Sequence, residues 1–228
     1  MRLPVSSWGP PGWQPRDGDH TLVAVGIYGD HVLPRLTNLL LGTSAFAAVR
    51  REACDGLHGD VVELGFGSGL NLAYLPDSVT GIWAVEPSGT ATRLASKRIA
   101  ASTAPVQVVG IDGAHLELPD RRFDAALSTM TLCTIPDVAS ALRELRRVLK
   151  PGASFHFAEH GHAPVDTIAR AQDQLNAMQM RFAGGCHLNR DIAALVAGAG
   201  FEIEQLRNFY LKGPKAWGYM YVGSARNA

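Results

Sequence analysis

A glycine-rich segment between two apolar runs is the first feature of this sequence that could do chemistry. The pattern Gly-x-Gly-x-Gly at 65–69 follows the apolar run 61–64 and precedes a short apolar segment that ends at Pro76. This order predicts a strand, a tight loop and a helix. Glycines let a ligand approach the loop backbone and the helix N-terminus. The spacing differs from the dinucleotide fingerprint G-x-G-x-x-G, because Leu70 stands where its third glycine would be, and it favours another nucleoside ligand.

The elements around this loop alternate between strand and helix. Short apolar runs predict strands, and apolar residues three or four positions apart predict helices. The expected strands occupy 61–64, 82–85, 106–109, 123–128, 153–158, 201–206 and 219–222. The expected helices occupy 90–101, 138–149, 165–182 and 189–199, with Asp137 and Asn189 as caps. The alternation predicts a parallel sheet covered on both faces, and the last two strands predict an antiparallel hairpin.

Two segments at the beginning of the chain lie outside this alternation. Residues 1–20 are rich in Pro, Gly and Trp and predict a loosely held arm, whereas 21–57 has a helical pattern with a break around Gly42. The charged run 50–52 indicates a solvated face of that helical segment. The expected organisation is an arm at 1–20 and a single domain at 21–228, with a helical cap at 21–57 and a second capping segment at 163–187.

Composition narrows the classes of partner. The 228 residues carry 21 Lys plus Arg against 21 Asp plus Glu, so no long-range field attracts nucleic acid or an anionic membrane. Three cysteines without a C-x-x-C pair argue against a disulfide framework and indicate a reducing, cytoplasmic setting. The sequence shows neither a signal-peptide core nor an apolar run of roughly 20 residues. We expect a small-molecule ligand, no nucleic acid, no membrane span, and a monomer or homodimer.

Three stretches and one acidic residue between 60 and 158 follow a common pattern. They are VVELGFGSGLN at 61–71, Glu86 after the second strand, IDGAHLELPDRRFD at 111–124 and LRELRRVLKPGA at 142–153. Together they resemble the class I S-adenosylmethionine-dependent methyltransferases. The resemblance implies an α/β fold, a Rossmann-like, doubly wound, mostly parallel seven-stranded sheet with a C-terminal antiparallel strand. It also implies S-adenosyl-L-methionine as the cofactor.

Four shorter stretches are similar to one group within that superfamily. They are EPS at 86–88, STMTLCTIPD at 128–137, AEH at 158–160 and FAGGCHLNRD at 182–191. The group is the methyltransferase-like 7 group, the alkyl thiol S-methyltransferases. Phe66 and Ser68 depart from its pattern, since they replace the more usual Cys and Thr of the glycine loop. This closer similarity implies a thiol as the methyl acceptor.

The superfamily resemblance also assigns cofactor contacts to the strand ends. The glycine backbone would lie against the methionine part and the ribose, and Glu86 would accept the ribose hydroxyls. Asp112 would accept from the adenine amino group, with Gly113 and Ala114 facing the ring edge, and 128–129 would hold the methionine amino group. The expected cofactor-binding residues are Glu63, Gly65, Gly67, Ser68, Gly69, Asn71, Glu86, Pro87, Asp112, Gly113, Ala114, Ser128 and Thr129.

Histidines near the strand ends are candidates for activating an acceptor. A neutral thiol attacks poorly and benefits from a base. His160 directly follows the fifth strand, at the edge where ligands of such folds bind, and is the first candidate base. His187, beside Cys186, is the second. The alternative for His160 is a loop histidine that orders its own turn, and the alternative for His187 is a residue at the entry of a helix.

The two capping segments are expected to supply an apolar acceptor pocket. The helix at 165–182 has an apolar stripe that runs from Val165 to Phe182. The expected pocket residues are Tyr28, His31, Met178 and Phe182. The polar residues at 159–162 and 186–187 could instead bind a metal, but their spacing fits no zinc-finger pattern, so we expect none. Cys133 is interpreted as a small buried apolar residue in the loop after the fourth strand.

The leading hypothesis is methyl transfer from S-adenosylmethionine to a small apolar molecule, with a thiol as the first candidate. N-methylation of a phospholipid amine and C- or O-methylation of a quinone use the same core and stay open as alternatives. A cofactor-binding regulator without catalysis is a further hypothesis. Nucleic-acid methylation is disfavoured by the zero net charge and by STMTLC at 128–133, where an Asn/Asp-Pro-Pro-Tyr/Phe acceptor motif would stand.

Overall fold

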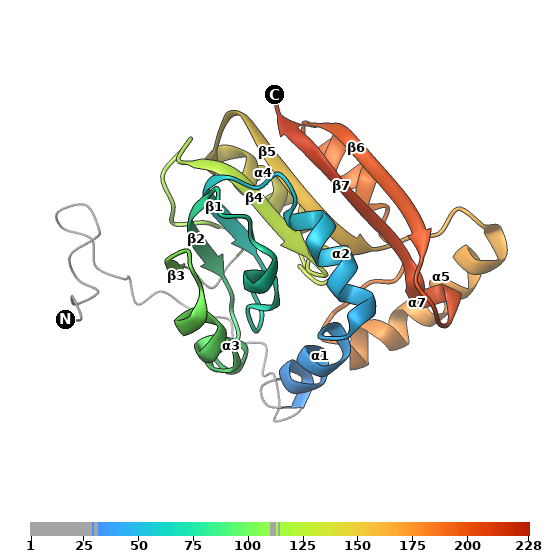
Figure 1. Cartoon of the computed structure of the whole chain (residues 1–228). Coiled ribbons are helices and arrows are strands. Elements are labelled where there is room, and N and C mark those ends of the chain that lie inside the picture. Colours follow the sequence, from blue (N-terminus) through green and yellow to red (C-terminus); the bar gives the residue numbers. More distant parts are fainter. Residues whose placement is uncertain (1–28, 30–31, 110–112, 114) are drawn as a thin grey trace.

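A sheet of seven strands organises the chain (Figure 1). The computed structural model describes residues 29, 32–109, 113 and 115–228. The strands are β1 (Gly59–Leu64), β2 (Val79–Val85), β3 (Val106–Val108), β4 (Phe123–Thr129), β5 (Leu149–His160), β6 (Phe201–Tyr210) and β7 (Tyr219–Asn227). The helices are α1 (Leu33–Leu41), α2 (Ser44–Cys54), the 3-10 helix η3 (Leu70–Tyr74), α3 (Gly89–Ala101), α4 (Val138–Val148), α5 (Asp166–Phe182), α6 (Ile192–Gly198) and α7 (Lys215–Gly218).

The strand order is β3-β2-β1-β4-β5-β7-β6, and β7 runs antiparallel to both of its neighbours. The pairs from β3 to β5 are parallel. This confirms the predicted doubly wound fold with an antiparallel finish. Because the chain proceeds outward from β1 in one direction and from β4 in the other, the crevice between their carboxyl ends is where open α/β sheets bind ligands.

Both faces of the sheet are buried, which explains why its strands are nearly continuous apolar runs. Along β1, Val61 packs into the core cluster beneath α2 and α3, whereas Val62 and Leu64 pack into the cluster beneath α4 and α6. Successive side chains of a strand point to opposite faces. The side chains of β1 therefore pack alternately against the helices on one face of the sheet and against those on the other.

Two helices, α3 and α4, begin at residues whose side chains accept a hydrogen bond from the first turn. Ser88 Oγ accepts from Ala91 N at 3.1 Å at the start of α3, and Asp137 Oδ1 accepts from Ser140 N at 2.9 Å at the start of α4. The predicted cap at Asn189 is wrong. Asp191 caps α6 by accepting from Ala194 N at 3.0 Å, because its carboxylate is one residue from the first turn.

The strand β5 is longer than predicted at both ends. The Lys-Pro-Gly segment 150–152 resembles a helix stop, yet α4 ends at Val148 and the chain enters β5 at Leu149. The pairing with β4 shifts register between Phe123 and Ala125, and such an irregularity accommodates Pro151 and Gly152 in a strand. At its other end β5 continues to His160, so this histidine is fixed in the sheet instead of following it in a loop.

The apolar stripe predicted for α5 is exposed at both ends and only partly buried at Ile168 between them. Val165 is 46% exposed and Phe182 is 59% exposed. Gln172 is the buried residue of this helix, and its side chain bonds Ala163 N at 2.8 Å and the carbonyl of Gly161 at 2.9 Å. A polar anchor therefore holds α5 against the end of β5, which leaves apolar side chains at its surface.

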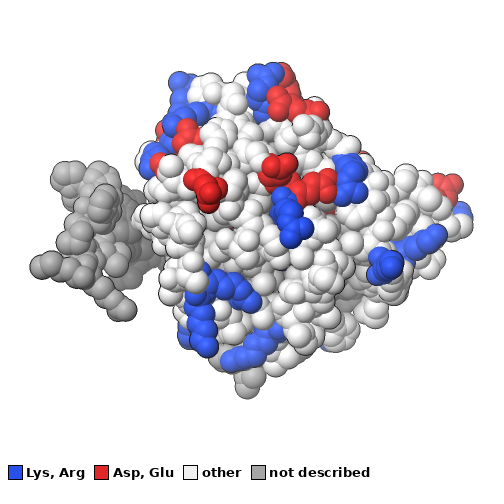
Figure 2. All heavy atoms as spheres, in the orientation of Figure 1, with Lys and Arg blue, Asp and Glu red and all other residues white. Residues whose placement is uncertain are grey.

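The described surface carries charges of both signs. In Figure 2 basic and acidic side chains are scattered over the visible face, separated by uncharged surface. A bilayer-spanning helix is not found anywhere in the described ranges.

The expected arm at 1–20 lies outside the described residues, and the expectation of one domain at 21–228 stays a prediction.

Candidate active site

The carboxyl ends of four parallel strands meet at one edge of the sheet. Leu64, the last residue of β1, pairs with Val85 of β2 and with Ser128 of β4. Thr129, the last residue of β4, pairs with Ala158 of β5. Figure 1 shows the arrows of these strands ending at the lower edge, where α1 and α5 also lie. Side chains from separate loops are thus brought together here.

The glycine loop takes left-handed backbone conformations that other residues rarely adopt. Gly65, Gly67 and Gly69 have φ of 68°, 58° and 73°. A Cβ at Gly65 would lie 2.0 Å from Thr131 Oγ1, so the loops after β1 and β4 touch at this glycine. The loop leads into η3, a tighter helix than the α-helix.

Glu86 links β2 to the glycine loop. Its Oε2 accepts from Gly67 N at 2.7 Å, and its Oε1 accepts from Ser88 N at 2.8 Å. Burial raises the pKa of Glu86, although both backbone hydrogen bonds act in the opposite direction. The two predicted cofactor residues Gly67 and Glu86 are therefore in direct contact.

A buried polar network lies beneath the glycine loop. Asn71 Nδ2 donates to Glu63 Oε1 at 2.6 Å and to Thr129 Oγ1 at 3.0 Å. Arg50 of α2 donates to Asn71 Oδ1 at 2.7 Å and to Thr129 Oγ1 at 3.0 Å. The prediction that the run 50–52 is a solvated face is wrong for Arg50, which is buried, because its guanidinium bonds this network.

Glu63 keeps one oxygen unpaired inside this network. Its Oε2 is buried and has no hydrogen-bond partner among the described residues. Burial raises the pKa of Glu63 to about 8, against the hydrogen bond from Asn71 and the charge of Arg50. A cationic or hydroxyl donor on a ligand would satisfy this oxygen. The residues therefore fit a ligand that carries an ammonium group, as S-adenosylmethionine does.

Two serines of the predicted cofactor set bond to protein groups. Ser68 Oγ donates to Asn38 Oδ1 at 2.7 Å, which places α1 against the glycine loop. Ser128 Oγ donates to Glu159 Oε1 at 2.8 Å and is fully buried. Ser128 is thus one support of the Glu159 carboxylate, and its predicted contact with the methionine amino group stays a prediction.

The remaining predicted cofactor residues are partly described. Pro87 is exposed beside Glu86. A Cβ at Gly113 would lie 3.7 Å from Ile135 Cδ1 and 3.9 Å from Leu64 Cδ2, which places Gly113 next to the end of β1. Asp112, Ala114, Tyr28 and His31 lie outside the described residues.

His160 contacts two cysteines that come from distant parts of the sequence. Its Nε2 lies 2.9 Å from Cys186 Sγ, and Cys186 Sγ lies 3.6 Å from Cys133 Sγ. His160 Nδ1 is buried without a partner in the described part of the chain. Burial lowers the pKa of His160, but the contact with Cys186 and the charge of Glu159 outweigh it, so the pKa lies above its ordinary value.

Sequence reasoning missed Cys133. Its thiol is buried, as predicted, but it faces Cys186 and His160 and does not pack as an isolated apolar group. No spacing rule could have found this set, because the three residues come from the loop after β4, the end of β5 and the turn after α5. For Cys133 and His160, positions at or just after the ends of the adjacent strands β4 and β5 were the available signal.

The second candidate histidine and the pocket residues lie further out. His187 Nδ1 is 3.5 Å from Asn176 Nδ2, and partial burial together with Arg190 lowers the pKa of His187. Met178 is 48% exposed and Phe182 is 59% exposed. These two α5 residues are therefore surface residues near the carboxyl edge, and their contact with an acceptor stays a prediction.

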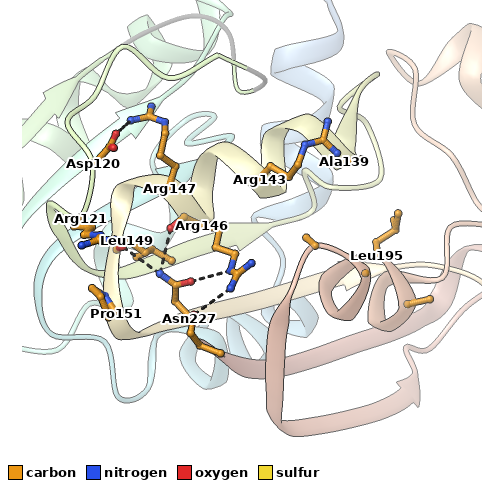
Figure 3. A pocket seen from close by; sticks show the side chains of 14 residues that line it. Asp120, Arg121, Ala139, Arg143, Arg146, Arg147, Leu149, Pro151, Leu195 and Asn227 are labelled. Atoms are coloured by element: carbon orange, nitrogen blue, oxygen red, sulfur yellow. Dashed lines mark hydrogen bonds and ion pairs between the residues drawn. The ribbon is translucent and has the colours of Figure 1, made fainter.

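A hollow of about 700 Å³ lies elsewhere on the molecule. Figure 3 shows Arg143, Arg146 and Arg147 of α4 beside it, with Asn227 bonded to Arg146. Its other lining residues come from the start of α4, the beginning of β5, α6 and the residue after it, the last two residues 227–228 and the segment before β4. Since ligands of this fold bind at the carboxyl ends of the strands, this hollow is separate from the candidate site.

Comparison with known proteins extends this description. Residues 62–157 match a family described as a methyltransferase domain. Thiol S-methyltransferase TMT1B of Rattus norvegicus is 28% identical over 150 residues, 64% of this chain and 61% of that protein. Demethylmenaquinone methyltransferase of Thermobifida fusca is 40% identical over 76 residues, 33% of this chain and 32% of that protein. The chain thus spans less than two thirds of the length of these relatives.

A solved structure shares the fold. A SAM-dependent methyltransferase of Thermotoga maritima superposes with a TM-score of 0.64 at 20% identity, covering 87% of this chain and 99% of that one. The matched domain begins in β1 and ends in β5 before its last residues, so it contains the glycine loop, Glu86 and the ends of β1, β2 and β4. Residues 62–157 are therefore similar to a methyltransferase domain, and the chain shares the fold of a SAM-dependent methyltransferase.

Proposed function

We propose that this protein transfers the methyl group of S-adenosylmethionine to the sulfur of a small apolar thiol. The observation that carries the proposal is the similarity to a thiol S-methyltransferase over 64% of the chain, well beyond the methyltransferase domain alone. The geometry supports it, because one imidazole and two thiols lie at the carboxyl edge of the sheet, where the glycine loop also lies. Cys133 follows β4, His160 is the last residue of β5, and Cys186 follows α5 at that edge.

The cofactor contacts that we propose follow the polar groups of the edge. Glu86, already within 2.7 Å of Gly67 N, accepts the ribose hydroxyls. Glu63, with one unpaired buried oxygen, faces the cofactor ammonium group through the network of Asn71 and Arg50. The backbone of the glycine loop lies against the methionine part and the ribose. Asp112 and Ala114, with Gly113, are proposed for the adenine.

The protein's contribution to the reaction is alignment and proton removal. When bound, S-adenosylmethionine supplies a sulfonium methyl group that a nucleophile attacks in line. His160 is proposed to act on the acceptor by favouring its thiolate, because a thiol with a reference pKa of about 8.5 is mostly neutral at pH 7. His187 is the second candidate for this role. Met178 and Phe182 offer apolar surface to an incoming acceptor.

One specific observation favours a second acceptor class. The relative with 40% identity over 76 residues is a demethylmenaquinone methyltransferase, so C-methylation of a quinone is the alternative. That similarity covers 33% of this chain, about half the share covered by the thiol enzyme. The thiol therefore stays the first candidate.

A panel of acceptors tests the proposal. We expect a small apolar thiol to be methylated faster than amines, phenols or quinones of matched size, with labelled S-adenosylmethionine as the methyl donor. Product formation is followed for each acceptor at the same concentration, and a reaction without protein is the control. A clear preference for the quinone would replace the thiol by the alternative, and no transfer to any acceptor would favour a regulator.

The Glu86→Ala variant tests the proposed cofactor contact. It should weaken binding of the product S-adenosylhomocysteine by about 1.5 to 3 kcal/mol, because hydrogen bonds to a charged group contribute that much. Titration calorimetry measures the change, and Glu202→Ala on the exposed strand β6 is the matched control. Unchanged affinity of Glu86→Ala would remove this carboxylate from the site.

A further inference from the structure

Cys133, His160 and Cys186 place three ligand atoms side by side at the carboxyl edge. Cys186 Sγ lies 3.6 Å from Cys133 Sγ and 2.9 Å from His160 Nε2, and all three atoms lie within 4.8 Å of one another. Cys133 and His160 are buried, and Cys186 is partly exposed. The proposed function uses the histidine of this set but neither thiol.

The separations are close to those of a tetrahedral metal site. Zinc binds cysteine sulfur at about 2.3 Å and histidine nitrogen at about 2.0 Å, so its tetrahedron separates two sulfurs by about 3.8 Å and a sulfur from a nitrogen by about 3.5 Å. The distance of 3.6 Å between the sulfurs of Cys133 and Cys186 matches the first value. The contact between Cys186 and His160 must lengthen, and the partial exposure of Cys186 gives its side chain room to rotate.

The segments that carry the three ligands are fixed by other contacts. Both oxygens of Glu159 accept from Thr131 N, at 3.0 and 2.8 Å, which anchors the loop of Cys133 to β5. Arg190 donates to the carbonyl of Ile135 at 2.8 Å, and His187 N donates to the carbonyl of Cys133 at 2.8 Å. The thiols are thus held near one another by backbone contacts on both sides, which is how metal sites are preorganised.

We propose that Cys133, His160 and Cys186 bind a zinc ion. Three protein ligands leave the fourth tetrahedral position open, as in catalytic zinc sites. Resting on the proposed function, the acceptor thiol takes this position and loses its proton to water, as coordinating thiols do. The two cysteines also bind as thiolates and release one proton each, and no electron is transferred. The absence of metal predicted from the sequence is thereby revised, because that prediction left Cys133 out of the set.

Zinc binding to the reduced full-length chain tests the site. Competition with a chromophoric chelator should show one tightly bound zinc per chain. Cys133→Ser, Cys186→Ser and His160→Ala should each weaken binding by at least about 100-fold. Cys54→Ala, which changes the remaining cysteine in the core beneath α2, should bind zinc like the unchanged chain. Binding of S-adenosylhomocysteine shows that each variant is folded.

Cobalt gives a second readout that does not depend on activity. The cobalt-loaded chain should show a sulfur-to-metal charge-transfer band, and Cys133→Ser or Cys186→Ser should remove about half of its intensity, since one thiolate of two is lost. The zinc site is overturned if folded variants bind zinc as tightly as the unchanged chain, or if the unchanged chain binds no zinc.

Activity of the metal-free chain separates this inference from the proposed function. If zinc binds and the acceptor panel shows no thiol methylation, the metal site holds and the thiol proposal fails. If a chelator-treated chain without zinc methylates thiols at the full rate, the proposed function holds and the open position is not where the acceptor binds. Loss of at least tenfold in rate on zinc removal, with recovery on readdition, is the expected result.

Discussion

Replacing Gly67 with alanine is expected to weaken S-adenosylhomocysteine binding by about 5- to 150-fold while the fold survives. A Cβ at this position would lie 3.9 Å from the Gly65 carbonyl oxygen, an ordinary van der Waals contact, so the methyl group clashes with no nearby protein atom. Its left-handed conformation costs about 1 to 2 kcal/mol. The added methyl group would displace a ligand that packs on the loop backbone. Such overpacking costs about 1 to 3 kcal/mol, which corresponds to a 5- to 150-fold loss of affinity.

Gly152→Ala is the matched control for this variant. Gly152 has φ of 77° with no atom within 4 Å of an added Cβ, and it lies at the beginning of β5, away from the carboxyl edge. Both variants should lose a similar free energy of unfolding in denaturant titrations, but Gly152→Ala should keep its affinity in calorimetry. Equal losses of affinity in the two variants would mean that the backbone of 65–69 does not approach the cofactor.

The conformation of the glycine loop and the position of Glu86 could be predicted from the sequence because their signals are local. Gly65, Gly67 and Gly69 are adjacent in the chain, and their left-handed conformations are what the residue type allows. Glu86 directly follows a strand whose apolar run is unmistakable, and parallel strands place their ends at one edge. The contact between Gly67 and Glu86 follows from these two facts together.

The network beneath the loop and the thiol cluster could not be predicted, because both depend on tertiary contacts. Arg50 stands in a charged run that is typical of a solvated helix face, and it is buried because α2 packs against β4 and β5 and its guanidinium bonds Asn71. Cys133 and Cys186 are 53 positions apart, and the turn at 184–186 brings them together. Neither Arg50 nor the two cysteines have partners at a helical, strand or motif spacing in the sequence.

One boundary and one burial pattern were wrong for a related reason. Pro151 and Gly152 end helices in most contexts, and here a register shift with β4 accommodates them in a strand. In α5 the predicted apolar stripe is a poor guide, since Gln172 makes the buried contacts of the helix. Local propensity was overridden by the packing of the neighbouring sheet at both places.

His160→Ala is expected to lower the turnover of a thiol acceptor by about 100-fold or more at pH 7, which is the size of effect that a group acting on proton removal has. The imidazole is buried and contacts the Cys186 thiol, and the glycine loop and Glu86 bond each other without it, so its removal leaves them unchanged. Binding of S-adenosylhomocysteine should therefore change by less than about twofold. His162→Ala, which removes another imidazole two positions away, should keep turnover and is the control.

The dependence of this defect on pH decides what His160 does. A free imidazole base and a zinc ligand both act by favouring the acceptor thiolate, and a thiol with a reference pKa of about 8.5 ionises without help at higher pH. The ratio of unchanged to variant turnover, measured with saturating cofactor from pH 6 to 9, should consequently shrink as pH rises. A ratio that stays constant with pH would show that His160 only orders the end of β5. A loss of turnover that is accompanied by a loss of cofactor affinity would show the same. His187→Ala would then be the next variant to measure, because its imidazole is the other candidate at this edge.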